Sequence, residues 1–231
     1  MPEARDASSV PEARTVSPPA PPDSARAVFG PALPLAVAYA ALLTGAGVER
    51  GLLGPREAAR IWDRHLLNCA VVADLIPRSC LVADLGSGAG LPGIVLAIMR
   101  PQCQLLLIEP MARRTAFLTE CAAELSLANL TVRRARAEEL AGQVGADVVT
   151  SRAVAQLDRL AGYASGLARP GGLILAIKGD AAVAELDQAM PVLHRLGATN
   201  VGVISAGAGV ISQPTTVIRF RTRAVRAHSG R

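Results

Sequence analysis

The chain has 231 residues, of which 51% are hydrophobic and only 3% aromatic, and its formal net charge is +5. This length suits one domain with a full core plus an extension. We expect no apolar run of membrane-spanning length, and residues 1–30 lack the contiguous apolar core of a signal peptide, so the composition argues against membrane and secreted proteins.

The four cysteines show no paired metal-ligand spacing and lie in apolar stretches: Cys69, Cys80, Cys103 and Cys121. This pattern predicts reduced thiols in a cytoplasmic protein without a bound metal. Positive charge is concentrated at the C-terminus, because residues 219–231 contain five arginines and no acid, while the rest of the chain has 19 basic and 19 acidic residues. Such a segment either contacts a polyanion or is simply solvated, and composition alone does not separate the two.

Residues 1–29 are predicted to form a disordered leader, since they are rich in proline, alanine, serine and alternating charge. A helical extension is expected over residues 30–79. Its first helix runs from about 34 to 44, and a longer helix runs from about 55 to 73. Arg64 and His65 lie in the second helix, where a histidine is more often a surface or capped residue than a functional one.

The most informative stretch is residues 81–93. The apolar run Leu81–Leu85 is typical of a buried parallel strand, and Pro92 stands where a helix would begin. Asp84 near the strand end is expected to point its carboxylate into the same crevice. The strand and the helix N-terminus predict a nucleotide-type site, built on three alternate glycines that allow a tight turn and close ligand approach: Gly86, Gly88 and Gly90.

Two classes of ligand suit such a turn. A dinucleotide needs G-x-G-x-x-G directly after the strand, and this pattern fits only from Gly88 to Gly93, two residues late. A site for S-adenosylmethionine needs an acid at the strand end and then G-x-G-x-G, which Asp84 and the three glycines match directly. A carboxylate there would form an ion pair with the ammonium group of that methyl donor. A nicotinamide-dependent oxidoreductase using the later register is the alternative.

Beyond residue 93 the pattern alternates between strands and helices. Further strands are expected over 104–108, 130–134, 147–150, 173–177, 199–204 and 215–221, and helices over 92–99, 112–127, 156–167 and 182–196. Residues 170–172 are expected to turn. This alternation, ending in a strand pair, predicts an α/β domain over 80–222 with a mostly parallel seven-stranded sheet and helices on both faces. Residues 223–231 then form a basic tail.

Ligands of such sheets bind at the carboxyl ends of the strands. Glu109 lies 23 residues beyond Gly86, about where a strand-end acid meets ribose hydroxyls. Lys178 is the only lysine among 24 basic residues, which suggests that a compact ammonium is needed there. We expect it to face the substrate, in a crevice lined by the polar residues that follow predicted strands: Asp84, Glu109, Glu138, Arg152 and Lys178.

The segment from Asp84 to Gly93 resembles the donor-binding motif of class I methyltransferases. With residues 62–67, 151–153 and 178–179, it resembles the RsmG family, also called GidB, over about residues 35–221. That family makes 7-methylguanosine in 16S ribosomal RNA. The resemblance implies a Rossmann-like, cytoplasmic S-adenosylmethionine-dependent rRNA (guanine-7-)-methyltransferase that acts in ribosome biogenesis on 16S rRNA or the small ribosomal subunit, without a membrane.

By motif, the resemblance implies that Gly86 and Leu91 contact the donor in the glycine turn. It further implies that Ala137 and Glu138 hold the adenine side, and that Arg152 is a further donor-site residue. The full set expected to bind the cofactor is Asp84, Gly86, Gly88, Gly90, Leu91, Glu109, Ala137, Glu138 and Arg152. One departure is visible, because Asn68-Cys69 replaces the Asp-Ser that many relatives have at this point.

Methylation of a guanine 7-nitrogen needs no general base, because that nitrogen has a free lone pair. Catalysis would then be positioning, with charge supplied by Arg152 and Lys178. Arginines would contact the RNA backbone around a splayed-out base. A monomer without a metal is expected, and a non-catalytic donor-binding factor in ribosome assembly is a second alternative.

Overall fold

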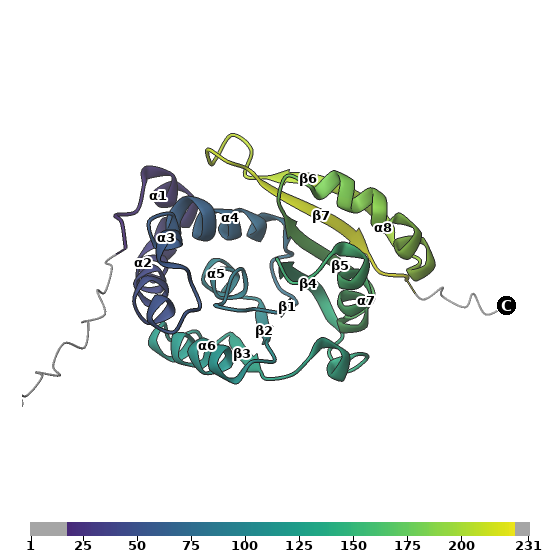
Figure 1. Cartoon of the computed structure of the whole chain (residues 1–231), viewed down its shortest axis with the longest axis horizontal. Helices are drawn as coiled ribbons and strands as arrows, with labels where there is room; N and C mark the ends of the chain where they lie inside the picture. Colours follow the sequence, from purple (N-terminus) through teal and green to yellow (C-terminus); the bar gives the residue numbers. More distant parts are fainter. Residues whose placement is uncertain (1–17, 225–231) are drawn as a thin grey trace, which may run out of the picture.

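A computed structural model describes residues 18–224, and its centre is a seven-stranded sheet with the order β3-β2-β1-β4-β5-β7-β6 (Figure 1). β7 (Thr215–Arg221) runs antiparallel to both of its neighbours, β5 and β6 (Thr199–Ala206). The other strands are parallel to one another: β1 (Leu81–Leu85), β2 (Gln104–Ile108), β3 (Leu130–Arg133), β4 (Ala146–Arg152) and β5 (Ala168–Lys178). The predicted fold class is therefore confirmed, and the strand order reverses between β1 and β4, where ligands of such sheets bind.

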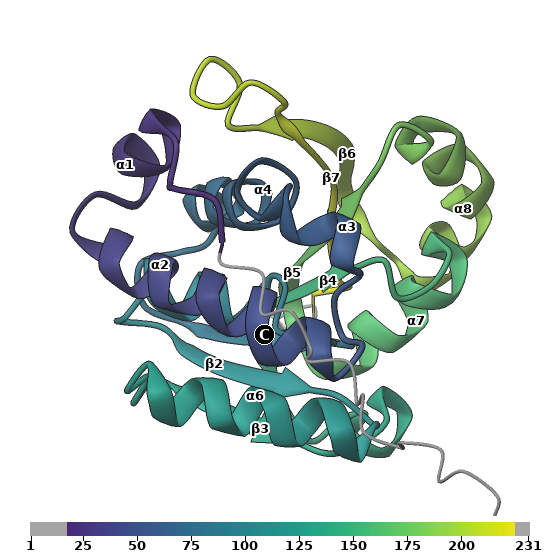
Figure 2. The same ribbon diagram turned by 60° about the vertical axis from the view of Figure 1, so that its left-hand side comes forward.

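Helices cover both faces of the sheet (Figures 1 and 2). One face carries α1 (Asp23–Phe29), α2 (Leu33–Leu42), α3 (Pro55–Ala58), α4 (Leu67–Ala70), α5 (Gly93–Met99) and α6 (Ala112–Glu124), and the other carries α7 (Leu157–Leu167) and α8 (Ala182–Leu196). Strand residues alternate between the two cores: Val148 and Leu175 belong to the first, and Val149 and Ala176 to the second. The same alternation therefore determines to which side of the sheet a side chain at a strand end points.

Residues 18–29 do not form the expected disordered leader. Helix α1 buries Ala25 and Phe29. The Phe29 ring meets Trp62 edge to face, with ring centroids 6.3 Å apart, and Trp62 Nε1 donates a hydrogen bond to the Pro19 carbonyl at 2.8 Å. Composition missed this anchor because the partner is far along the chain. Residues 1–17 and 225–231 lie outside the described residues, and so does most of the predicted basic tail.

Phe29→Ala is expected to lower the free energy of unfolding by about 3 kcal/mol, because it removes a ring that is only 3% exposed together with its aromatic contact. Urea unfolding measures this change. Arg26→Ala is the matched control, since Arg26 is an exposed residue of the same helix and should change stability by less than about 0.5 kcal/mol. Equally small losses in both variants would contradict the docking of α1.

The helical run Asp23–Gly47 is long and apolar enough to span a membrane by length and composition, with a window of mean hydropathy 1.8. The expectation that no run reaches this length is therefore wrong. In the structure, Ala36, Tyr39 and Leu43 of this run are buried in the first core. The Tyr39 hydroxyl also donates to the Ala89 carbonyl at 2.7 Å, so the run supports the glycine turn.

The single helix expected from about 55 to 73 is broken. After α3 the chain forms a π-helical turn at Ile61–Leu66, then α4, then a 3-10 turn at Val71–Leu75. Arg64 and His65 lie in the π-helical turn. Such turns occur often at functional sites, because they shift side chains out of the regular helical register.

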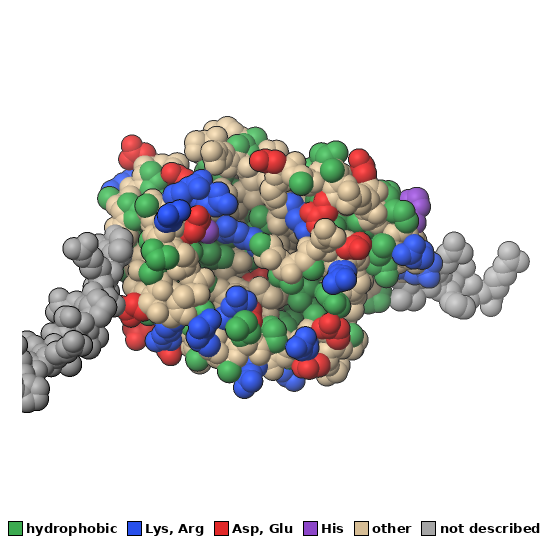
Figure 3. Space-filling model, viewed as in Figure 1, with side chains coloured by type: hydrophobic (Ala, Val, Ile, Leu, Met, Phe, Trp, Pro, Cys, Tyr) green, Lys and Arg blue, Asp and Glu red, His purple; other side chains and the backbone are tan. Residues whose placement is uncertain are grey.

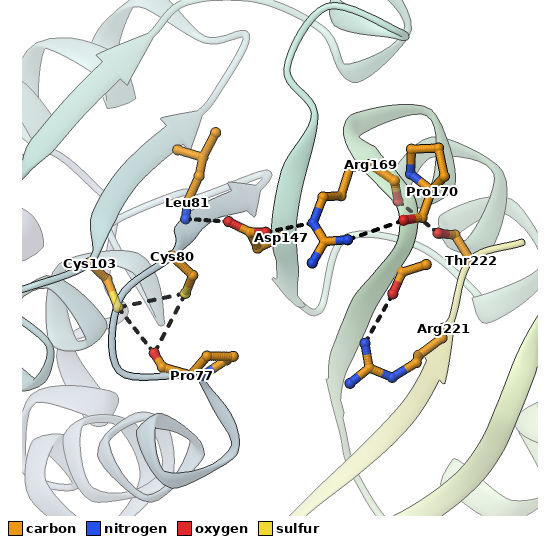
Figure 4. A network of polar contacts seen from close by, with 10 residues as sticks. Pro77, Cys80, Leu81, Cys103, Asp147, Arg169, Pro170, Arg221 and Thr222 are labelled. Atoms are coloured by element: carbon orange, nitrogen blue, oxygen red, sulfur yellow. Dashed lines mark hydrogen bonds and ion pairs between the residues drawn. The ribbon is translucent and has the colours of Figure 1, made fainter. Parts of the chain in front are cut away.

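Strand β5 starts earlier than expected and includes residues 170–172, which were predicted to turn. Figure 4 shows the contacts that hold this start. Arg169 Nε donates to Asp147 at 2.6 Å, Asp147 accepts a second hydrogen bond from the Leu81 amide at 2.9 Å, and the Thr222 hydroxyl donates to the Arg169 carbonyl. These contacts brace the amino ends of β1, β4 and β5, at the edge opposite the glycine turn.

All four cysteines are free. Two of them, Cys80 and Cys103, bring their sulfur atoms to 3.6 Å at the same braced edge (Figure 4). Among residues 18–224, no group of three or more His, Cys, Asp or Glu side chains is arranged to hold a metal ion.

Candidate active site

The glycine turn joins β1 to α5 at the carboxyl edge of the sheet. Gly86, Gly88 and Gly90 have φ angles of +69°, +59° and +100°, a region that favours glycine. The amides of Gly86 and Ser87 donate to the Ile108 carbonyl at 2.9 and 3.1 Å, which ties the turn to the end of β2. Figure 3 shows a hollow near the middle of this view, with Lys and Arg side chains gathered over α3, α4 and α6.

The glycines differ in what surrounds them. A Cβ on Gly90 would lie 2.5 Å from Ile94, and a Cβ on Gly93 would lie 2.6 Å from the Asp84 carboxylate. Both positions face the protein interior. In the dinucleotide pattern the second glycine, here Gly90, lets the backbone approach the pyrophosphate, whereas the third, here Gly93, serves helix–strand packing. Because Gly90 faces the interior, the later register offers no open cradle.

Gly88 is the open position of the turn. A Cβ there would meet nothing closer than the Gly86 carbonyl oxygen at 3.9 Å, whereas a Cβ on Gly86 would lie 2.5 Å from a methyl group of Val154. Val154 is itself 39% exposed. Gly88 is therefore the part of the turn that a ligand can approach, and the exposed Val154 side chain stands over Gly86 beside it. An open Gly88 fits the register expected for a methyl donor.

Asp84 lies beneath the turn and is fully buried. One carboxylate oxygen accepts from the Gly93 amide at 3.1 Å, and the other accepts from the Thr150 hydroxyl at 3.1 Å. Burial raises the pKa of Asp84 to about 6. The expectation that Asp84 points into the crevice is wrong, because two internal donors hold its carboxylate inside the protein. Its observed role is to fix the turn from behind.

Glu109 lies directly beside the open part of the turn, one residue beyond the end of β2. Its side chain is almost fully buried, and its two oxygens accept from the amides of Gly88 and Met111, both at 3.0 Å. Arg114 Nη1 is 3.7 Å from the same carboxylate. The structure therefore brings this strand-end acid onto the glycine turn through one hydrogen bond.

Two further residues expected at the site, Ala137 and Glu138, follow the neighbouring strand β3. The 3-10 turn Ala137–Leu140 follows β3, with Ala137 buried and Glu138 exposed. The Glu109 amide donates to the Arg133 carbonyl at 3.1 Å, so the ends of β2 and β3 are joined. Leu91 is half-buried between the turn and α5.

Arg152 links the end of β4 to the N-terminal extension. Its guanidinium donates to Cys69 Sγ at 3.5 Å, to the Arg64 carbonyl at 3.2 Å and to His65 Nδ1 at 3.0 Å. His65 Nε2 lies 2.8 Å from the Glu57 carboxylate. Because a guanidinium only donates, His65 Nδ1 accepts and Nε2 carries the proton that is donated to Glu57.

His65 is therefore a buried neutral group and not the surface residue that its helix position suggested. It is 7% exposed, and burial and the charge of Arg152 lower its pKa to about 4. Sequence reasoning missed the role of Glu57 and His65, because no local pattern reveals a contact between residues 87 positions apart. The short Trp-Asp-Arg-His segment was the available signal.

His65→Gln is expected to change how stability depends on pH. His65 titrates near 6.5 in the unfolded chain and near 4 in the folded protein, so the unfolded chain binds more protons between these values. The wild-type protein therefore loses stability as pH falls through this window. Glutamine can accept from Arg152 and donate to Glu57 without titrating. Relative to the variant, the unfolding free energy of the wild type should fall by about 2 kcal/mol between pH 7 and pH 5.

The variant is needed as a reference because Asp84 changes the unfolding free energy with pH in the opposite direction. Its raised pKa makes the folded protein bind more protons between 3.8 and about 6, so its contribution to stability is lost as pH rises through that range. Urea unfolding of both proteins at the two pH values gives the difference. A difference that does not change with pH would contradict a buried neutral His65.

Lys178 ends β5, but its ammonium points into the protein. The side chain is 9% exposed, and Nζ donates to the Ala155 carbonyl at 2.8 Å and to Glu185 Oε1 at 2.7 Å. The same Glu185 oxygen accepts from the Leu157 amide at 2.7 Å. The expectation that Lys178 faces the substrate is therefore wrong, and the compact ammonium is explained by a narrow buried position between a carbonyl and a carboxylate.

Lys178 and Glu185 together hold the loop that follows β4. Ala153 in this loop has φ +54°, which is uncommon for a residue with a side chain. Such strain persists only where surrounding contacts fix it, and the hydrogen bonds to Ala155 and Leu157 do so here. The loop carries Val154 over Gly86, a contact that sequence reasoning did not find.

Known proteins resemble this chain over most of its length. Residues 32–216 match the family model GidB, described as rRNA small subunit methyltransferase G. The chain is 53% identical over 199 residues to ribosomal RNA small subunit methyltransferase G of Thermobifida fusca, covering 86% of this chain and 84% of the relative. The homologous protein of Salinispora tropica is also 53% identical, over 227 residues, covering 95% of this chain and 90% of the relative.

Solved structures with the same fold are more distant. A SAM-dependent O-methyltransferase from Thermotoga maritima superposes with a TM-score of 0.55 at 12% identity, covering 70% of this chain and 67% of its own. TYW2 of M. jannaschii, solved in complex with AdoMet, gives a TM-score of 0.55 at 15% identity, covering 71% and 78%. These likenesses establish the fold shared with S-adenosylmethionine-dependent methyltransferases.

Proposed function

Because this chain belongs to the GidB family of rRNA small subunit methyltransferases G, we propose that its glycine turn binds S-adenosylmethionine and that the protein methylates the 7-nitrogen of a guanine in 16S rRNA. S-adenosylmethionine supplies an electrophilic methyl group. The observation that carries the proposal is the open backbone at Gly88 with the Glu109 carboxylate 3.0 Å from the Gly88 amide. Strand-end acids at this place bind ribose hydroxyls in doubly wound folds.

In this proposal, Gly86 and Gly88 present bare backbone to the donor, and Glu109 accepts hydrogen bonds from its ribose. Leu91 lies beside the turn, and the adenine side rests on the turn that contains Ala137 and Glu138. Asp84 and Gly90 act from behind, because their contacts lie inside the protein. In this division the glycines allow the donor to approach the backbone closely, and the buried carboxylate of Asp84 fixes the conformation of the turn.

Arg152 retains capacity for a ligand. A guanidinium has five N–H groups, and three of them donate to Cys69, Arg64 and His65, so two remain without a partner among the described residues. The remaining two lie on Nε and Nη1 and point to different sides of the guanidinium, so each can donate a single charge-assisted hydrogen bond. We assign them to polar groups of the donor, while Lys178 acts as a positioning residue that holds the β4–α7 loop.

The chain needs to supply no general base. The lone pair of guanine N7 is free, so what the protein contributes is orientation of the base against the methyl group. The neutral, fixed tautomer of His65 serves this purpose by keeping Arg152 in one position. Arg152 and the Lys178–Glu185 pair thus hold opposite sides of the loop next to the reacting atoms.

RNA is assigned to the arginine-rich rim of the hollow. Figure 3 shows Lys and Arg side chains around it, and exposed arginines occur in the α3 region and after β3: Arg56, Arg60, Arg64, Arg134 and Arg136. Arginine contacts to phosphates release counterions and give a steep salt dependence. The proposed partner is the small ribosomal subunit, with a cytoplasmic monomer as the working form. The extension, revised to residues 18–79, is proposed to fold together with the domain at 80–222 because it shares the first core.

Calorimetric titration of the purified protein with S-adenosylmethionine and with NAD⁺ separates a methyltransferase from the alternative oxidoreductase. We expect binding of the first alone, since Gly90, which would have to approach a pyrophosphate, faces inward. Radiolabelled donor is then incubated with small subunits, naked 16S rRNA and total RNA. Label in 16S rRNA supports the enzyme, and donor binding without any transfer would support the non-catalytic assembly factor instead.

A further inference from the structure

A separate pocket of about 410 Å³ lies between the loop after β4 and the first turns of α8. Its apolar wall includes Val154, Ala155 and Ala184, and its polar groups belong to Gln156, Glu185 and Gln188. A few polar groups on an apolar wall, at this volume, are typical of a small-molecule or base site. No residue assigned to the donor lines it.

Val154 is the wall that this pocket shares with the glycine turn. It lines the pocket, and one of its methyl groups lies 2.5 Å from where a Cβ on Gly86 would be. A ligand in the pocket and a ligand on the turn would therefore both contact Val154 and would meet each other beside the exposed part of this side chain. Such direct contact is what two reactants of one transfer step require.

Glu185 gives the pocket its chemical preference. Its Oε1 is held by Lys178 and by the Leu157 amide, so the carboxylate has a fixed orientation. Its Oε2 has no hydrogen-bond partner among the described residues. This oxygen is also accessible, because only two side-chain atoms of the described residues are both buried and unpartnered, namely Asn68 Oδ1 and Ser151 Oγ. Glu185 therefore offers the pocket an accessible, oriented acceptor with an adjacent countercharge.

We propose that this pocket receives the target guanine, with its N1–H and N2 amino group both donating to the free Oε2 of Glu185. The inference rests on the proposed function and specifies how that site selects its base. Adenine has an acceptor at N1, so it would set a lone pair against the carboxylate. Flipped bases are commonly read on this edge.

The orientation also suits the reaction. N7 lies on the side of the purine opposite N1 and N2, on the edge exposed in the major groove of a duplex. With Glu185 holding the far edge, N7 faces the glycine turn along the exposed side of Val154. The N7 lone pair forms the new bond to the methyl carbon while the methyl–sulfur bond breaks and leaves its electron pair on sulfur, so no proton moves and guanine gains a positive charge.

The test uses the full-length protein with S-adenosylhomocysteine, and follows binding of guanosine and adenosine monophosphate by saturation-transfer NMR. We expect the guanine nucleotide to bind at least about tenfold more tightly. Glu185→Gln should remove this preference. The glutamine N–H groups would face the N1–H and amino group of guanine, which are also donors, while the glutamine oxygen can still accept from Lys178. Equal binding of both nucleotides to the wild type would overturn the proposal.

Ala184→Trp, which fills the pocket, should lower methylation of small subunits at least about tenfold and leave donor affinity within twofold. Val183→Trp is the matched control, because Val183 is 61% exposed on the same helix and does not line the pocket. Wild-type methylation by the Ala184 variant would also overturn the proposal. If the wild type binds donor but methylates no RNA, the proposed function fails. The nucleotide-binding experiment still shows in that case whether the pocket selects guanine.

Discussion

Gly86→Val is expected to weaken binding of S-adenosylmethionine by roughly 100-fold or more, about 2.7 kcal/mol. Gly86 has φ +69°, which a β-branched residue rarely adopts. Its side chain would also enter the space between the turn and Val154, where a Cβ already lies 2.5 Å from the nearest methyl group. Isothermal titration with the donor measures the loss.

The matched control is Gly142→Val. Gly142 has φ +74°, but a Cβ there would meet nothing within 4 Å. Both variants carry the same backbone strain, so Gly142→Val should lose stability and keep donor affinity. A folded Gly86→Val protein with wild-type affinity would place the donor elsewhere.

The second large effect is expected at Arg152. Arg152→Ala should slow methylation by roughly 100-fold or more, because it removes the two N–H groups assigned to the donor and leaves His65 Nδ1 and the Arg64 carbonyl without their donor. Arg152→Lys should recover less than about a tenth of the activity, since an ammonium cannot reach acceptors spread around a planar fork. Single-turnover assays on small subunits give these rates.

Arg195→Ala controls for the loss of one positive charge, because Arg195 is exposed in the last turn of α8. It should methylate at close to the wild-type rate. A separate donor titration of Arg152→Ala shows whether the lost activity reflects donor binding. Full activity in Arg152→Lys would mean that only charge is needed at this position and that the hydrogen-bonded geometry is incidental.

The arrangement of the sheet could be predicted because each strand carries its own signal. The ranges 81–85, 104–108 and 215–221 match the structure at both ends, since each is a short run of apolar or β-branched residues next to turn-forming or polar positions. Helix α8 also has the predicted bounds. Docking of α1 could not be predicted, because Phe29 and Pro19 gain their role only through contact with Trp62.

The direction of side chains at strand ends was harder to predict than their position. Lys178 does follow β5, but strand alternation places it on the face of Ile174 and Ala176, which pack in the second core beneath α8. The same alternation places Asp84 with Val82, facing α5. Applying the period of two beyond the last apolar residue would have identified both as inward-pointing, whereas Glu57 and Glu185 required the tertiary structure.

The central claim is that this site transfers a methyl group to guanine N7 in 16S rRNA. Small subunits labelled by the purified protein and radioactive S-adenosylmethionine can be digested to nucleosides and separated by chromatography. All label should elute as 7-methylguanosine from 16S rRNA, and Gly86→Val should yield none. Label in a different methylated nucleoside, or on ribosomal protein, would contradict the account.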